Sequence, residues 1–357
     1  MQNPFTTTFS KTPEYTYIET EGSREIIENF SYESPSEAVY KITGVRGSGK
    51  TVILAKVEEA YKTEENRKNG WIVCRLSPAR DMLQQFAALL HKENIIKEKP
   101  QSLSISVSAN ILGTGGGIGY AASENNHFFD IGVEISEMLS ICAGNGQKIL
   151  IGIDEVSRTP EMIAFASEFG TWLRAGYPVY MVCTGLYENI QELSNVKNLT
   201  FFRRASTIKT GPLNMVRMSE TYKSKLQIDS EMAKELAAVT RGYAYAFQEL
   251  GVLYFKKSNE ETLDDILQSL KTELFSYSYE KIWEELSEED RRLARTLKDK
   301  PEYKREEILA ELGAKSANYS VYRDRLFKRG IITIRRAHIS LALPYFGEYI
   351  KEYGLFS

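Results

Sequence analysis

The chain has 357 residues, a net charge of −3, 42% hydrophobic residues and 26% charged residues, the composition of a soluble globular protein with two or three domains. Its three cysteines are widely spaced and its three histidines isolated, which excludes a disulfide framework and a zinc site. No apolar run reaches the roughly 18 residues of a membrane span. We therefore expect a cytoplasmic protein with no membrane partner.

The first motif lies between a predicted strand over 38–43 and a predicted helix over 52–61. The octapeptide between them fits the phosphate-binding pattern G-x-x-x-x-G-K-[ST] at every defined position. Its glycines let backbone N–H groups approach phosphate oxygens, Lys50 supplies a cation, and Thr51 supplies a hydroxyl ligand for magnesium. The residues expected to bind the nucleotide are Gly44, Val45, Arg46, Gly47, Ser48, Gly49, Lys50, Thr51 and Val52.

Strands and helices alternate as far as residue 210. Further apolar strands are predicted over 70–76, 148–153 and 179–184, with helices over 24–30, 83–90 (capped by Asp81), 131–139 and 162–175. The glycine-rich segment 102–122 does not fit a dinucleotide-binding spacing and is predicted to be a flexible hairpin or loop. The alternation predicts an α/β fold with a parallel sheet covered on both faces.

Two carboxylates, Asp154 and Glu155, follow the apolar strand 148–153. Ligands of open α/β sheets bind beyond the carboxyl ends of the strands. We therefore expect Asp154 to hold magnesium and Glu155 to polarise an attacking water. The alternative is an ordinary acidic turn at a strand end. Together with the phosphate loop, the pair favours an ATP hydrolase.

After Pro212 the predicted elements are helical, and a small β-hairpin follows near the C-terminus. Helices are predicted over 230–239, 263–274, 287–298, 302–312 and 316–329, with strands over 331–334 and 338–343. The last three helices and the two strands have the order of a winged helix-turn-helix, with Arg335-Arg336 as its wing turn. The predicted domains are therefore an α/β domain over 1–211, a helical lid over 212–285 and a winged-helix domain over 286–357.

The C-terminal segment 287–357 carries fifteen Lys and Arg against eleven Asp and Glu, although the whole chain is acidic. In a winged helix the third helix enters the major groove and the wing contacts phosphates. The candidate contacts to double-stranded DNA are Asn318, Arg323, Lys328, Arg329, Arg335 and Arg336. The alternative is a winged helix that contacts protein, with Tyr319, Tyr322 and Phe327 in a core or an interface.

With these motifs the chain resembles AAA+ ATPases of the origin-recognition and initiator type, especially a bacterial branch of uncharacterised ATP-binding proteins. The resemblance extends over nearly the whole chain. It is carried by the phosphate loop, by Asp154-Glu155, and by the segments 3–5, 22–25, 70–71, 201–205 and 242–248. It implies an AAA+ core, a helical lid and a winged helix, with ATP or ADP and Mg²⁺ as ligands.

The resemblance also implies roles for single residues. Thr184 occupies the sensor 1 position and would bond the γ-phosphate or the attacking water, unless it is a core threonine. Arg203 and Arg204 stand where the family carries an arginine finger that reaches a neighbouring subunit of a homo-oligomer; the alternative is a solvated arginine pair. The lid arginine of the family is replaced by Tyr245, for which Arg241 could substitute unless it simply ends a helix.

The missing lid arginine favours slow hydrolysis or a switch held by its nucleotide. We expect a slow Mg²⁺-dependent ATPase that couples nucleotide state to DNA binding through the winged helix. The alternative function is a nucleotide switch in signalling or defence, similar to STAND proteins, whose winged helix binds protein. In a third reading ATP is bound and not turned over.

Overall fold

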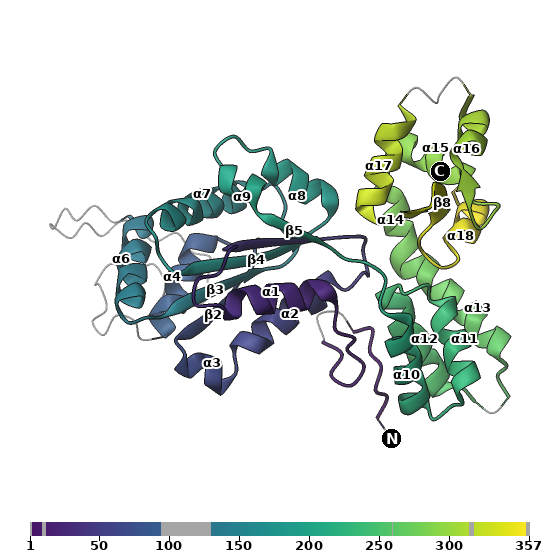
Figure 1. The fold of residues 1–357 in the computed structure, drawn as a ribbon, viewed down its shortest axis with the longest axis horizontal. Helices are drawn as coiled ribbons and strands as arrows, with labels where there is room; N and C mark the ends of the chain where they lie inside the picture. Colours follow the sequence, from purple (N-terminus) through teal and green to yellow (C-terminus); the bar gives the residue numbers. More distant parts are fainter. Residues whose placement is uncertain (1, 9–11, 94–129, 259, 314–317, 355–357) are drawn as a thin grey trace, which may run out of the picture.

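The computed structural model describes residues 2–8, 12–93, 130–258, 260–313 and 318–354. Figure 1 shows an α/β unit on one side and an elongated, mainly helical body on the other. The segment 102–122, predicted to be a hairpin or loop, lies outside the described residues. No helix in the described ranges is long and apolar enough to cross a membrane.

A five-stranded parallel sheet with the order β2-β3-β4-β1-β5 forms the centre of the α/β unit. Its strands are β1 (Val39–Thr43), β2 (Trp71–Leu76), β3 (Lys148–Ile153), β4 (Val179–Gly185) and β5 (Ser206–Lys209). At the carboxyl edge, Thr43 is in register with both Gly185 and Lys209. The loop after β1 therefore leaves the sheet between two neighbouring strands, and the predicted parallel sheet is confirmed.

Helices cover both faces of this sheet (Figure 1). They are α1 (Glu21–Ser31), α2 (Lys50–Tyr61), α3 (Glu64–Lys68), α4 (Met82–Lys92), α6 (Ile131–Gly144), α7 (Pro160–Arg174), α8 (Tyr187–Ser194) and α9 (Thr200–Arg204). Successive side chains of a strand point to opposite faces. Accordingly Leu150 packs in a cluster with α1 and α2, while Ile149 and Ile151 pack in a second cluster with α4, α6 and α7. The sheet thus separates two apolar cores.

The helical body, which we call the lid–wing body, runs from α10 to α18. Its helices are α10 (Met215–Leu226), α11 (Ser230–Val239), α12 (Ala244–Lys256), α13 (Leu263–Leu274), the π-helical turn η1 (Phe275–Tyr279), α14 (Glu280–Glu284), α15 (Glu288–Thr296), α16 (Arg305–Leu312), α17 (Tyr319–Arg329) and α18 (Phe346–Glu352). Thr262 forms a capping box at the start of α13, and Asp229 and Ser287 cap α11 and α15 with their side chains.

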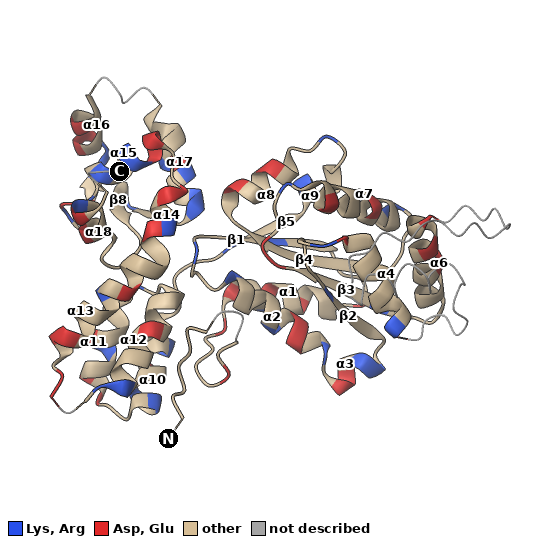
Figure 2. Ribbon diagram, turned by 180° about the vertical axis from the view of Figure 1, so that it is seen from behind, with Lys and Arg blue, Asp and Glu red and all other residues tan. Residues whose placement is uncertain are grey.

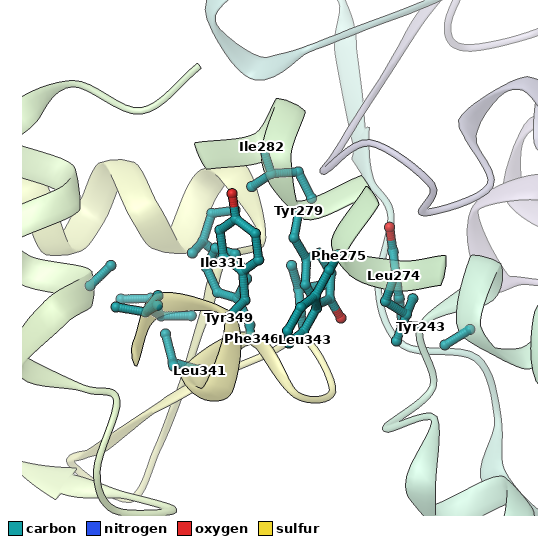
Figure 3. Close-up of a cluster of buried hydrophobic side chains, with 14 of the residues drawn as sticks. Tyr243, Leu274, Phe275, Tyr279, Ile282, Ile331, Leu341, Leu343, Phe346 and Tyr349 are labelled. Carbon is teal, nitrogen blue, oxygen red and sulfur yellow. The ribbon is translucent and has the colours of Figure 1, made fainter. Parts of the chain in front are cut away.

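One apolar cluster extends through the whole lid–wing body, from Phe247 of α12 to Ile350 of α18. Figure 3 shows its centre, where Tyr279 of the π-helical turn meets the wing residues Phe346 and Tyr349. The ring centroids of Tyr279 and Phe346 are 5.0 Å apart, and the Tyr279 hydroxyl donates to a backbone carbonyl near the wing. Lid and winged helix therefore share a single core.

The winged helix differs from the predicted one at two points. Strands β6 (Tyr303–Lys304), β7 (Ile332–Arg335) and β8 (His338–Leu341) form a three-stranded sheet with the order β6-β8-β7. The helix predicted from residue 302 begins only at Arg305, because Tyr303 and Lys304 pair with β8. The wing turn also lies one residue later than predicted: Arg336 and Ala337, with φ of 46° and 65°, form a two-residue hairpin.

Candidate functional site

The loop between β1 and α2 has the geometry of an anion site. Gly49 caps α2 in the left-handed region, with φ of 90°, and Gly47 has φ of 73°. The first N–H groups of a helix have no partner inside the helix, and the helix dipole makes this end positive. The backbone of the loop thus presents donors to a phosphate.

The lid closes directly over this loop. The Tyr245 N–H donates to the Gly47 carbonyl at 3.0 Å, and the Tyr243 hydroxyl donates to the Arg46 carbonyl at 2.8 Å. Because the Tyr243 hydroxyl has one hydrogen, Ser278 of the π-helical turn must donate in its 2.6 Å contact with Tyr243. A Cβ at Gly47 would lie 2.3 Å from the Tyr243 hydroxyl oxygen. Glycine is therefore needed at Gly47 for lid contact as well as for backbone conformation.

Lys50 lies at the start of α2 and donates to the carbonyls of Gly44 and Val45 at 2.9 and 3.0 Å. Burial lowers the pKa of its ammonium to about 8, and the neighbouring Arg46 cation adds to this effect. A phosphate would supply the negative charge that favours the protonated form. Lys50 is thus placed to form an ion pair with a bound phosphate.

The predicted magnesium residues lie together at the carboxyl edge of the sheet. The Thr51 hydroxyl is 3.2 Å from Asp154 Oδ1, and the same oxygen accepts the hydroxyl of the buried Thr184. Hydroxyl and carboxylate oxygens suit Mg²⁺, so Thr51 and Asp154 fit this ion. Among the described residues there is no cluster of three or more His, Cys, Asp or Glu side chains that could hold a metal without help from a ligand.

Glu155 faces a cavity, whereas the hydroxyl of Thr184 forms hydrogen bonds within the protein. The Glu155 side chain is exposed and its backbone has φ of 55°, uncommon for a residue with a side chain. Its N–H donates to the Thr184 hydroxyl oxygen at 3.1 Å. Thr184 therefore fixes both acidic residues at the strand end, and in this arrangement its hydrogen points to Asp154 and not to a phosphate.

The cavity beside the loop has a volume of about 1080 Å³. Four parts of the molecule line it: residues 46–53, the lid helices, an N-terminal arm formed by residues 2–8 and 12–20, and the carboxyl edge of the sheet with Arg75 and Glu155. Of the predicted nucleotide residues, Gly44 and Val45 lie outside its wall, in a small hollow beside Arg329 and Glu188. The others, from Arg46 to Val52, line the cavity.

Sequence reasoning did not find the arm as a wall of the site. Phe5 is buried in the lid, where a Cβ at Gly251 would lie 2.3 Å from its ring. The Gln248 side-chain oxygen accepts from the Thr6 N–H at 3.1 Å and the Thr16 hydroxyl at 3.0 Å. The segment 242–248, quoted for the resemblance, contained this signal, but a glutamine alone does not name its partner.

Among its described residues, the lid contributes no arginine to the wall of the cavity. Tyr245 lines the cavity at the position expected for the lid arginine. Arg241, with φ of 50°, follows the end of α11 and donates to the Leu341 carbonyl of β8 at 3.2 Å. Arg241 thus contacts the wing instead of the cavity, and it does stand at a helix end.

Some of the candidate DNA-contacting residues are exposed to solvent, and others contact side chains of the protein itself. Asn318, Arg335 and Arg336 are exposed. Arg323 and Lys328 both lie near Asp324, at 3.3 and 3.5 Å. Figure 2 shows basic and acidic residues side by side on α15 and α17, so this surface has no single sign of charge.

The last turn of α17 rests on the α/β unit. Arg329, whose side chain is only 12% exposed, forms an ion pair with Glu188 of α8. The ammonium of Lys209 in β5 donates to the Phe327 carbonyl and lies 3.7 Å from the Phe327 ring centroid. This end of the predicted recognition helix is therefore already in contact with the α/β unit.

Arg203 and Arg204 are both exposed at the end of α9. Neither guanidinium has a hydrogen bond or an ion pair with the part of the chain that the structure describes. Beneath them, the buried Lys41 of β1 donates to the Phe202 carbonyl at 2.7 Å. The helix end that carries the two arginines is thus held by a hydrogen bond, while both guanidinium groups are exposed.

Sequence reasoning also did not single out Arg75 of β2. Its guanidinium lines the cavity and lies 3.1 Å from Asp154 Oδ2. A single arginine in an apolar strand gives no sign of such a contact.

Comparison with known proteins shows which fold this is. The Walker-type ATPase PABY2304 of Pyrococcus abyssi matches with a TM-score of 0.63 and 12% identity over 96% of this chain and 98% of that one. The ORC2 protein of Aeropyrum pernix, in complexes with ADPNP and ADP, matches with a TM-score of 0.55 and 10% identity over 97% and 96%. Its ADP form matches with a TM-score of 0.51, 10% identity and 98% coverage of both chains.

These likenesses show the predicted fold: a parallel sheet with the strand order of an AAA+ core, a helical region and a small C-terminal antiparallel sheet like that of a winged helix. A family model described as "Domain of unknown function (DUF8462)" matches residues 276–350, from the π-helical turn into α18. No curated protein matches the sequence.

Proposed function

We propose that the chain binds ATP with Mg²⁺ in the cytoplasm and hydrolyses it slowly. Backbone N–H groups of the loop and Lys50 would hold the phosphates, and Thr51 with Asp154 would hold the metal. Held there, magnesium would supply positive charge that offsets the charge of the phosphates. The residue contacts at the sheet edge support this assignment, since Thr51 lies 3.2 Å from Asp154 Oδ1 and both Lys50 and Thr51 line the cavity.

The residues around the cavity support slow turnover. Glu155 would orient the attacking water, because it is exposed to the cavity just beyond Asp154. The lid supplies Tyr245 in place of an arginine, and the Thr184 hydroxyl donates its hydrogen bond to Asp154. Arg203 and Arg204 would complete the site of a neighbouring copy in a homo-oligomer. A monomer therefore lacks part of the charge that stabilises phosphoryl transfer.

The output would be a change in how the winged helix is presented to double-stranded DNA. The observation that carries this proposal is the direct bonding of the lid to the phosphate loop, through Tyr243 to Arg46 and Tyr245 to Gly47. Because lid and winged helix share one core, a shift of the loop on nucleotide binding would move both. We propose working domains of 1–211, 212–285 and 286–357, with the last two moving together.

Electrophoretic mobility of duplex DNA with ATP, ADP or no nucleotide tests the coupling. We expect salt-dependent binding whose affinity differs between ATP and ADP. Equal binding in all three states would remove the coupling, and no binding in any state would remove the DNA function.

A second function is favoured by the contact of α17 with the α/β unit. The turn around Phe327 and Arg329, which would otherwise meet DNA, is occupied by Lys209 and Glu188. This supports a STAND-like switch whose winged helix contacts the core in one state and a protein partner in another. Nucleotide-dependent capture of a protein without DNA binding would identify it.

A further inference from the structure

Arg75 joins two acidic residues that belong to different elements. Its Nη2 is 3.1 Å from Asp154 Oδ2, and its Nη1 is 3.3 Å from both carboxylate oxygens of Glu58. The Arg75 side chain is 37% exposed, whereas those of Asp154 and Glu58 are 16% and 5% exposed. One guanidinium in the cavity wall thus pairs with both the carboxylate proposed for the metal and a buried carboxylate of α2.

Glu58 lies against the sheet at a position where the strand has no side chain. It lies on α2, and a Cβ at Gly152 of β3 would be 2.0 Å from its Oε1. Glycine weakens a strand interior and often marks a close approach, which explains Gly152 in an otherwise apolar strand. Lys62 is the second cation at Glu58, 3.3 Å from Oε2. A buried carboxylate needs such partners, so Glu58 keeps Arg75 nearby whatever happens at Asp154.

At Asp154 the same guanidinium lies beside the carboxylate that would hold the metal. Oδ1 accepts the hydroxyls of Thr51 and Thr184, and Oδ2 faces Arg75. A magnesium ion held by Thr51 and Asp154 would therefore lie close to a second cation, and the two repel each other. Glu58 offers the guanidinium an alternative anion within its present reach.

We propose that Arg75 is a positioning residue that balances the charge of Asp154 until metal and nucleotide bind, and that Glu58 then retains it. This inference rests on the proposed function, a site for ATP with magnesium. Arg75 weakens metal binding at Asp154 by competing for the carboxylate. Glu58 strengthens metal binding by drawing the guanidinium away. The two residues thus set the magnesium concentration at which the site becomes loaded.

The test measures the Mg²⁺ concentration that gives half of the Mg²⁺-dependent gain in affinity for a fluorescent ATP analogue. Arg75→Gln should lower this concentration roughly fivefold to tenfold, because the competing cation is gone. Glu58→Gln should raise it by a similar factor, because Arg75 then has only Asp154. The double variant should behave like Arg75→Gln. Arg80→Ala, at an exposed arginine beyond the same strand, is the control and should match the wild type.

Opposite shifts of the Mg²⁺ requirement distinguish this role from structural support. If the two residues only supported the structure, both variants would bind metal and nucleotide more weakly. Folding of each variant is checked by thermal denaturation, and the Glu58→Gln result decides alone if Arg75→Gln does not fold. The proposal is overturned if Glu58→Gln lowers the Mg²⁺ requirement or leaves it unchanged. If the wild type shows no Mg²⁺-dependent nucleotide binding, the proposed function itself fails; normal binding without opposite shifts removes only the role of Arg75.

Discussion

The α/β unit and the lid–wing body are held together in different ways. In the α/β unit the sheet divides the apolar side chains into two cores, one on each face. In the lid–wing body one core passes from the lid into the winged helix. Apart from the N-terminal arm, whose Phe5 and Ile18 are buried in the core of the body, and from Val45, which packs against that core, the two regions are joined by polar pairs. Among these are the 3.3 Å pair of Arg46 with Glu285 and the pair of Arg329 with Glu188.

This difference indicates where the molecule can move. Separating lid from winged helix would expose a shared apolar core, whereas shifting the whole body against the α/β unit exchanges polar contacts for water. Those polar contacts surround the phosphate loop. A ligand at the loop can therefore favour one arrangement of the body over another by a few interactions. The predictions below test this contrast, beginning with the largest expected effect.

Glu155→Gln should retain ATP binding and lower turnover by about 10²–10⁴-fold, because the amide cannot take a proton from water. Single-turnover hydrolysis with a parallel binding assay measures both quantities. Glu161→Gln, at an exposed position of α7, is the matched control. Unchanged turnover in Glu155→Gln would refute the role of Glu155 and leave the α/β unit without its assigned base.

Replacing Arg203 and Arg204 with Ala should lower turnover at least about tenfold at high protein concentration and have little effect at low concentration. An arginine finger supplied in trans acts only in an assembly, and such fingers are worth about 10³–10⁵ in rate. Turnover per subunit is measured across a dilution series, with Lys197→Ala as a control at an exposed site near α9. A loss that is independent of concentration would contradict action in trans.

Glu188→Ala should raise DNA affinity in the absence of nucleotide by about threefold to tenfold, because it releases Arg329 and the end of α17 from the α/β unit. The change leaves the winged helix itself untouched. Mobility shift measures the effect, and Glu192→Ala on the same helix is the control. A fall in DNA affinity would show that the docked arrangement is the one that binds DNA.

Nucleotide affinity should fall a fewfold as the pH rises above about 8, since the Lys50 pKa is lowered to about 8 by burial. Below that pH Lys50 is already protonated; above it, phosphate binding must bring a proton. Calorimetry in two buffers of different ionisation enthalpy should show proton uptake near and above pH 8. Binding without proton uptake there would contradict a buried lysine that meets the phosphate.

The sequence was sufficient for the parts of the molecule that depend on local pattern. The order strand, glycine loop, helix predicted the anion site, and the apolar run before Asp154 predicted its place at the sheet edge. Caps at Asp81 and Asp229 lie next to the helices they begin. In each case the interacting residues are neighbours in the chain, so spacing determines geometry.

The parts that were missed depend on contacts between distant residues. Arg75 and Glu58 meet only because β2 and α2 lie beside β3; Gly152 was the available signal, since a glycine in an apolar strand indicates close approach. The pairing of Tyr303 with Ile339 shortened a predicted helix by tertiary contact. The docking of α17 on β5 and α8 likewise depends on residues far apart in the chain, Arg329 with Glu188 and Phe327 with Lys209, which no local pattern reveals.

The central claim is that the lid and the winged helix move as one body when nucleotide binds. Distances between spin labels at Ala164 of α7, Lys234 of α11 and Glu311 of α16 would measure this movement, since all three positions are exposed. The native cysteines Cys74, Cys142 and Cys183 are buried. Between the ADP and Mg²⁺–ATP states we predict a change in both distances from Ala164 and a constant distance between Lys234 and Glu311. A changed distance between Lys234 and Glu311, or three constant distances, would contradict the claim.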